Sequence, residues 1–145
     1  MGATLTGVVG TQFAQRKNAD RQWRRDRRFA SYIEFASQAH KVAETNEIFV
    51  DAYQAHVTIA GLNRILGDIA TEANTLRQLQ WAVRLAGSPT MARLSAELAE
   101  RAANILKFWG PDGFIGEYDV DLDRAKYLTD LDVNAFIKAA ETEIT

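Results

Sequence analysis

Residues 30–60 read ASYIEFASQAHKVAETNEIFVDAYQAHVTIA, and this stretch decides the predicted fold. It has no proline and is rich in alanine, a composition that favours the α-helix. On a wheel of 100° per residue, its apolar side chains fall within a sector of roughly 100°, as expected of a helix face that packs on a core. These side chains are Tyr32, Phe35, Ala39, Val42, Phe49, Val50, Tyr53, Val57 and Ala60. The stretch therefore predicts one long first helix.

Glycines mark the predicted end of this helix. No proline interrupts residues 30–86, and Gly61 and Gly67 are of the residue type that most often closes a helix in the left-handed conformation. We therefore expect a turn within residues 61–68. Apolar residues at spacings of three and four then predict a second helix from about Ile69 to Ala86.

A serine–proline pair marks the start of a third helix. Ser88 supplies an N-cap hydroxyl, and Pro89 occupies the first helical position, where its missing N–H costs nothing. The broad apolar face that follows ends after Trp109, where Gly110-Pro111 stops the helix.

The remainder of the chain predicts a loop and two shorter helices. Residues 110–120 contain three glycines and a Pro-Asp-Gly turn signal, together with apolar side chains that should pin the loop down. A short helix near 122–128 follows, and then a final helix near 130–144. Thr129, with Asp132 three residues later, resembles a capping box at the start of that last helix.

Length decides how these helices fit together. A first helix of up to about 50 residues is ~75 Å long, whereas a second helix of about 18 residues is only ~27 Å long. The N-terminal part of the first helix must therefore project or pair with another chain, and we expect a homo-oligomer. We predict an all-α fold, an antiparallel helical bundle with one long, projecting N-terminal helix. Residues 1–29 form the basic extension, and residues 30–145 form a single helical-bundle domain.

The composition excludes several classes of protein. The 145 residues are 47% hydrophobic and 25% charged, as in one soluble domain of ordinary size. The absence of cysteine excludes disulfides, thiolate zinc sites, iron–sulfur clusters and thiol nucleophiles. The apolar stretch Gly2–Val9 is far shorter than the roughly 20 residues that a helix needs to cross a bilayer.

Catalytic motifs are missing, since the sequence has no HExxH, GxSxG, P-loop or GxGxxG pattern. His40, Glu44, Glu47 and Asp51 share one stripe of the first helix and imitate one wall of a metal site. That stripe lies opposite the apolar sector, so we expect it to face water. We therefore predict a protein that is not an enzyme and has no catalytic residues, metal, cofactor or small-molecule substrate.

A second group of side chains that resembles part of a metal site lies near the C-terminus. Asp119, Asp121 and Asp123 match the first three ligands of an EF-hand calcium loop. The sixth position of that loop requires glycine for a sharp turn, and here it is Arg124. We favour a role for these carboxylates in capping the short helix that follows, because the positive end of a helix dipole attracts them.

The formal net charge of −2 conceals an asymmetry along the chain. Residues 1–40 carry seven Lys or Arg against three Asp or Glu, whereas residues 110–145 carry three against nine. The basic residues concentrate in RQWRRDRR at 21–28, with Arg16 and Lys17 before it. Six arginines and one lysine within 13 residues create a local field that no other segment matches.

This basic segment is the candidate functional site, and three uses are open to it: a solvated helix face, binding to membrane headgroups, or binding to nucleic acid. The side of the helix that packs on the core is continued in this segment by Lys17, Arg21, Arg24 and Arg28. These turns should therefore extend past the bundle and face water, an anionic surface or the acidic C-terminal segment. The predicted anionic-surface-binding residues are Arg16, Lys17, Arg21, Trp23, Arg24, Arg25, Arg27 and Arg28.

Three stretches carry a resemblance to a known group of proteins: TLTGVVG at 4–10, RQWRRDRRFASYIEFA at 21–36 and LQWAVRLAGSPTMARLSAELAERA at 79–102. They resemble short helical proteins of actinobacteria and their phages, in which a membrane helix is followed by an Arg-rich stretch and a helical domain. The resemblance implies that, if a membrane span preceded Thr11, the arginines would mark its cytoplasmic side. Because Gly2–Val9 is short, we expect the membrane helix to be missing or reduced to a stub in this chain.

These observations lead us to expect a non-enzymatic interaction or scaffolding protein. It would be cytoplasmic, and peripheral to or anchored at the inner membrane, and its basic helix would bind an anionic membrane surface or a protein partner. The alternative is a nucleic-acid-binding helical protein that uses the same Arg-rich segment.

Overall fold

The computed structural model describes residues 2–110 and 121–144, and the described residues form helices without any strand. The helices are α1 (Gly2–Gln54), α2 (Ile59–Ala86), α3 (Pro89–Trp109), α4 (Leu122–Leu128) and α5 (Val133–Ile144). The all-α prediction is confirmed. No helix in these two ranges is long and apolar enough to cross a membrane.

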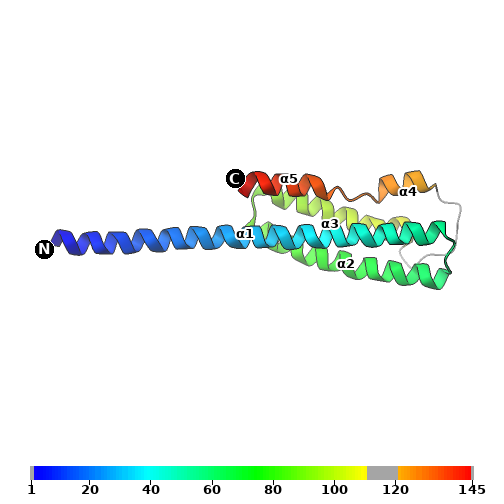
Figure 1. Cartoon of the computed structure of the whole chain (residues 1–145), viewed down its shortest axis with the longest axis horizontal. Helices are drawn as coiled ribbons and strands as arrows, with labels where there is room; N and C mark the ends of the chain where they lie inside the picture. The colour runs from blue at the N-terminus through cyan, green and yellow to red at the C-terminus, as the bar shows by residue number, and fades with distance from the viewer. Residues whose placement is uncertain (1, 111–120, 145) are drawn as a thin grey trace.

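The helices form an antiparallel bundle from which α1 projects, as predicted. Figure 1 shows α2 running back along the C-terminal half of α1, and α3 and α5 packing against the same half. The N-terminal half of α1 continues beyond the point where α2 ends. We call residues 2–27 of α1 the extension; at 1.5 Å per residue it is about 39 Å long.

The apolar stripe predicted on the first helix forms the centre of the core over most of its length. Its members from Tyr32 to Tyr53 are buried, and Phe35, Val42 and Phe49 are completely inaccessible to solvent. Aromatic rings from other helices complete this core. The ring of Phe136 in α5 lies 4.9 Å from that of Phe35, and the ring of Trp109 in α3 lies 4.5 Å from that of Phe49.

The first turn lies earlier than the glycines predicted. Helix α1 ends at Gln54, and Val57 and Ala60 are exposed rather than part of the core. Thr58 caps α2, because its hydroxyl accepts a hydrogen bond from the N–H of Gly61 at 3.2 Å. Gly61 and Gly67 therefore lie inside α2, which has 28 residues and spans the whole bundle.

The start and end of the third helix are as predicted. The Ser88 hydroxyl accepts a hydrogen bond from the N–H of Met91 at 3.2 Å, and Pro89 is at the first helical position. Gly110 follows Trp109 with a φ of 130°, a conformation that glycine adopts without strain. The turn between α2 and α3 places Ser88 beside Tyr32 of α1, where its N–H donates to the Tyr32 hydroxyl.

The C-terminal segment confirms one predicted cap and corrects another. Asp121 caps α4 by accepting from the N–H groups of Asp123 and Arg124. Thr129 does not open the last helix: its hydroxyl donates to the carbonyl of Ala125 at 2.7 Å and so closes α4. Asp132 stands before α5 instead and accepts from the third residue of that helix. The loop prediction for 111–120 and Asp119 lie outside the described residues.

Candidate anion-binding surface

The basic side chains of α1 are held along a continuous helix that emerges from the bundle. All side chains from Gln15 to Arg27 are exposed, whereas Arg28 and Phe29 are half-buried where the helix meets the bundle. Residues 15–28 carry seven basic and two acidic side chains, a net charge of +5. Arg16, Lys17, Arg21 and Arg24 form no ion pair within the described part of the chain.

Arg28 has a structural contact as well as a position in the basic segment. Its Nε donates a hydrogen bond to the carbonyl of Ala86, the last residue of α2, at 3.1 Å. The last carbonyl groups of a helix lack partners within the helix, so a cation there is favourable. Among the predicted surface-binding residues, Arg28 is therefore partly committed to the fold.

Two arginines of the segment stack on aromatic rings of their own helix. The guanidinium carbon of Arg27 lies 4.9 Å from the ring centre of Trp23, and that of Arg25 lies 5.6 Å from the ring centre of Phe29. Such cation–π contacts at exposed sites contribute about 0.5–1 kcal/mol. Stacking uses the face of the Arg27 guanidinium, so the in-plane N–H donors of Arg27 can still meet a phosphate or carboxylate.

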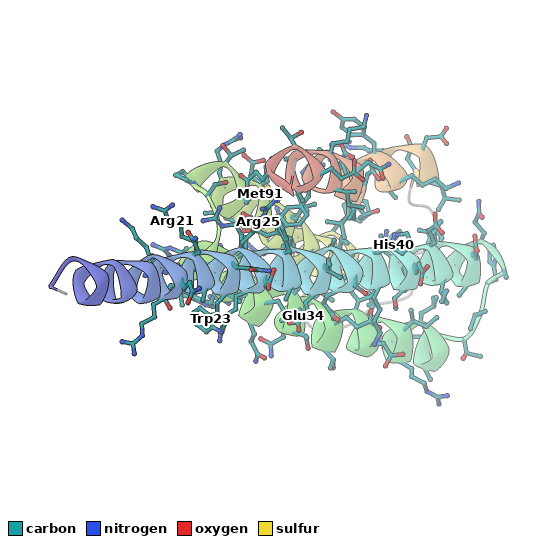
Figure 2. All side chains as sticks on the ribbon, turned by 60° about the vertical axis from the view of Figure 1, so that its left-hand side comes forward. Arg21, Trp23, Arg25, Glu34, His40 and Met91 are labelled. Carbon is teal, nitrogen blue, oxygen red and sulfur yellow. The ribbon has the colours of Figure 1, made fainter. Side chains whose placement is uncertain are left out.

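Two of the hollows along the base of the extension also reach a neighbouring helix. The first lies between α1 and the end of α2 and has a volume of about 720 Å³, within the roughly 300–1,000 Å³ typical of ligand clefts. We call it the α1–α2 groove; its lining is Trp23, Arg24, Arg27, Arg28, Ser31, Ala82, Leu85, Ala86 and Gly87. The second, of 330 Å³, lies towards α5 and is lined by Arg21, Arg24, Arg25, Arg28, Phe29 and Glu143. Figure 2 shows Trp23 on the α2 side of α1, and Arg21 and Arg25 on the other.

The sequence did not predict that α2 contributes to this surface. Leu85 is 84% exposed and Trp81 is 54% exposed, and the guanidinium carbon of Arg84 lies 5.2 Å from the ring centre of Trp81. Helical spacing from the core residues Leu76 and Val83 places Trp81 and Leu85 on the outer face of α2. That signal is present in the sequence, but only the fold brings Leu85 to the hollow that Trp23 also lines.

A hydrogen-bonded cluster at the other side of the base fixes α5 to α1. The Tyr32 hydroxyl donates to Glu143 at 2.6 Å and accepts from the N–H of Ser88 at 3.2 Å, while the Ser88 hydroxyl donates to Glu143. Burial, and then the Glu143 carboxylate, raise the pKa of Tyr32 above 10.0. Of the C-terminal carboxylates, Glu143 lines a hollow together with the arginines, whereas Figure 1 places α4, with Asp121 and Asp123, at the opposite end of the bundle.

The stripe that imitated a metal site faces water, as predicted. His40, Glu44, Glu47 and Asp51 are all exposed. The Nε2 atom of His40 lies 3.1 Å from Oε1 of Glu44, a contact between neighbouring turns. Over the two described ranges, no group of three or more His, Asp or Glu side chains is placed to hold a metal ion.

Comparisons of the chain with protein-family models, curated proteins and solved structures give no match. The resemblance to the actinobacterial and phage proteins stays a prediction.

Proposed function

We propose that this chain is a non-enzymatic interaction protein that binds an anionic membrane surface through the basic residues of α1. The observation that carries the proposal is the run of exposed, unpaired cations, Arg16, Lys17, Arg21 and Arg24, on a helix that leaves the bundle. Each basic residue near an anionic leaflet contributes about 1 kcal/mol of binding free energy. The four residues together would contribute about 4 kcal/mol, to which the other basic residues of the segment add.

The rest of the molecule suits a scaffolding role. Helix α1 is continuous from the extension into the core, so a partner bound to the bundle would be held at a fixed distance from the surface. The exposed aromatic residues beside the arginines favour a membrane over nucleic acid, because tryptophan is enriched at the boundary between headgroups and acyl chains. Binding to nucleic acid through the same arginines is the competing outcome in the test below.

Binding to vesicles tests the proposal. The wild type should bind phosphatidylcholine vesicles that contain phosphatidylglycerol, ignore vesicles of phosphatidylcholine alone, and lose binding as salt shortens the Debye length from ~10 Å at 0.1 M towards ~3 Å at 1 M. Reversing Arg16, Lys17, Arg21 and Arg24 to Glu should weaken binding by more than about 100-fold. This variant spares Arg28, whose bond to Ala86 would confound the result.

A second charge-reversal variant is the matched control. Changing Lys41, Arg64, Lys107 and Arg124 to Glu alters the net charge equally, at exposed positions of the bundle. It should lose far less binding than the variant of the extension. Equal losses would mean that only net charge matters. Binding to duplex DNA or RNA but not to vesicles would replace the proposal by the nucleic-acid alternative.

Self-association through α1 stays a prediction. Among residues 15–27, the part of the extension whose side chains are described, Trp23 is the one large apolar side chain that is exposed. Exposed apolar surface in this part therefore gives the predicted self-association little support. Light scattering at tens of micromolar protein tests it, and a monomeric mass contradicts it.

A further inference from the structure

The α1–α2 groove brings exposed apolar side chains and cationic side chains together on one surface. Trp23 on one wall is 59% exposed, and Leu85 on the other wall is 84% exposed. Neither side chain is part of the hydrophobic core. Exposed apolar side chains that gather beside one another mark binding surfaces more often than scattered ones do.

The charge of the groove is of one sign. Arg24, Arg27 and Arg28 line it, and its lining contains no Asp or Glu. The hollow on the other side of α1 differs, because Glu143 lies among its arginines and would repel an anion. The groove is therefore the more favourable of the two places for an anionic group, and arginine is well suited to hold phosphate oxygens through paired N–H donors.

Helix α2 extends the same surface outward. Trp81 lies one helical turn before Leu85 and is 54% exposed, with Arg84 stacked against it. Trp23 with Arg27 on α1 thus has a counterpart in Trp81 with Arg84 on α2. Paired tryptophan and arginine side chains are the composition of an interfacial anchor, with the cation at the phosphates and the ring at the edge of the acyl chains.

We propose that the α1–α2 groove is the seat of an anionic phospholipid headgroup, with Arg24 and Arg27 on its phosphate and Trp23, Trp81 and Leu85 in the apolar edge of the leaflet. This inference rests on the proposed function. It adds a second element, the end of α2, to the attachment. Contacts from two helices prevent the bundle from rotating about α1, so the bundle takes one orientation on the membrane.

Matched substitutions at two exposed apolar residues test the groove. Leu85→Glu should weaken binding to vesicles that contain phosphatidylglycerol by about tenfold or more, since it removes an apolar side chain from the leaflet and adds a repulsive charge. Ile33→Glu is the control: Ile33 is 67% exposed on α1 and does not line the groove. Its affinity for these vesicles should stay within about twofold of that of the wild type, because the one added charge lies outside the groove and has only a small effect. Both variants should keep the circular dichroism of the wild type.

Tryptophan fluorescence gives an independent readout. Vesicles with brominated acyl chains should quench the wild type, and the Trp23→Phe, Trp81→Phe variant should lose this quenching. Trp109 remains in that variant as an internal reference, because it is buried in the core beside Phe49. Soluble glycerol phosphate, used as a competitor, distinguishes a lipid site from a site for free phosphate and should not displace the protein from vesicles.

The possible results separate this inference from the proposed function. If the wild type binds anionic vesicles, but Leu85→Glu matches Ile33→Glu and no quenching occurs, the groove is not the docking site and the proposed function stands. Displacement by glycerol phosphate would reassign the groove to a soluble phosphate compound. If the wild type binds duplex DNA and not vesicles, both proposals fall.

Discussion

The two halves of α1 have the same helical geometry and opposite surroundings. From Tyr32 to Tyr53 the inward stripe is apolar and lies in the core, whereas the same side of the helix carries Arg24, Arg21 and Lys17 in the extension. Packing stabilises the C-terminal half of α1. The extension stays helical because elongating an existing helix adds one hydrogen bond per residue without a new nucleation step.

The difference shows which half is optimised for folding. Arginines at spacings of three and four repel one another along the extension, and Arg21 and Arg24 have no ion pair in the described residues to offset this. Natural sequences tolerate such local conflict mainly at functional sites. An anionic surface would remove the repulsion, so the extension gains more from a ligand than from the fold.

A series of aromatic-to-alanine substitutions along α1 should give the largest effects and trace the boundary between the halves. Phe35→Ala, in the core against Phe136, should lower the free energy of unfolding by about 3–5 kcal/mol. Phe29→Ala, which is half-buried, should cost less, and Trp23→Ala less than about 0.5 kcal/mol. Denaturation by urea measures all three. A cost for Trp23→Ala near that of Phe35→Ala would contradict the division.

A buried polar cluster deep in the packed half should give the next largest effect. Asn46 donates to Thr129 at 3.0 Å and accepts from the Trp109 indole N–H at 3.1 Å. Asn46→Ala leaves both partners without that bond and should cost about 1–3 kcal/mol in the free energy of unfolding. Glu47→Ala, at the exposed neighbouring position, is the control and should cost less than about 0.5 kcal/mol.

Much of this fold follows from the sequence because helix periodicity reports which face is buried. The stripe from Tyr32 to Tyr53 and the Ser88 cap were predictable on that basis. The first turn was not: glycine only permits the end of a helix, whereas the Thr58 hydroxyl makes a hydrogen bond that fixes where α2 begins. Within α2, Gly61 and Gly67 cost only about 1 kcal/mol each, which tertiary packing overrides.

The candidate site was predictable only in the part that lies on one helix. The arginines of α1 are adjacent in sequence, so their common field needed no fold. The groove combines α1 with Leu85, which is 62 positions after Trp23 in the sequence. A second helix that began near residue 69 would still end at Ala86, but sequence spacing alone does not say which face of α2 lies beside Trp23.

Titration of Tyr32, which lies where the extension meets the bundle, should have a smaller effect on the free energy of unfolding. Its raised pKa means that the folded chain holds the phenolic proton more tightly than the unfolded chain. This contribution to stability is fully present below pH 10 and decreases as the pH rises from 10 through the pKa of the folded state. Tyr32→Phe should lower the free energy of unfolding by about 1 kcal/mol near neutral pH, through the lost bond to Glu143.

The difference in the free energy of unfolding between the wild type and Tyr32→Phe should therefore become smaller above pH 10. Urea denaturation at a series of pH values measures it. Tyr127→Phe serves as the control, since Tyr127 is exposed, and should change the free energy of unfolding by less than about 0.5 kcal/mol. A gap that stays constant to high pH would mean that the Tyr32 phenol does not gain stability from its buried, hydrogen-bonded position.

Neutralising the extension should have the smallest effect on folding, and it is the sharpest test of the comparison. Arg21→Gln with Arg24→Gln removes two unpaired cations and keeps good helix formers in both positions. We expect the free energy of unfolding to change by less than about 0.5 kcal/mol, because neither side chain packs on the core. Relief of repulsion should slow hydrogen exchange in the extension at low salt, and this gain should vanish at high salt as screening removes the repulsion in both proteins. A loss above about 1 kcal/mol would show instead that these arginines stabilise the bundle, and the extension would then belong to the fold rather than to a partner.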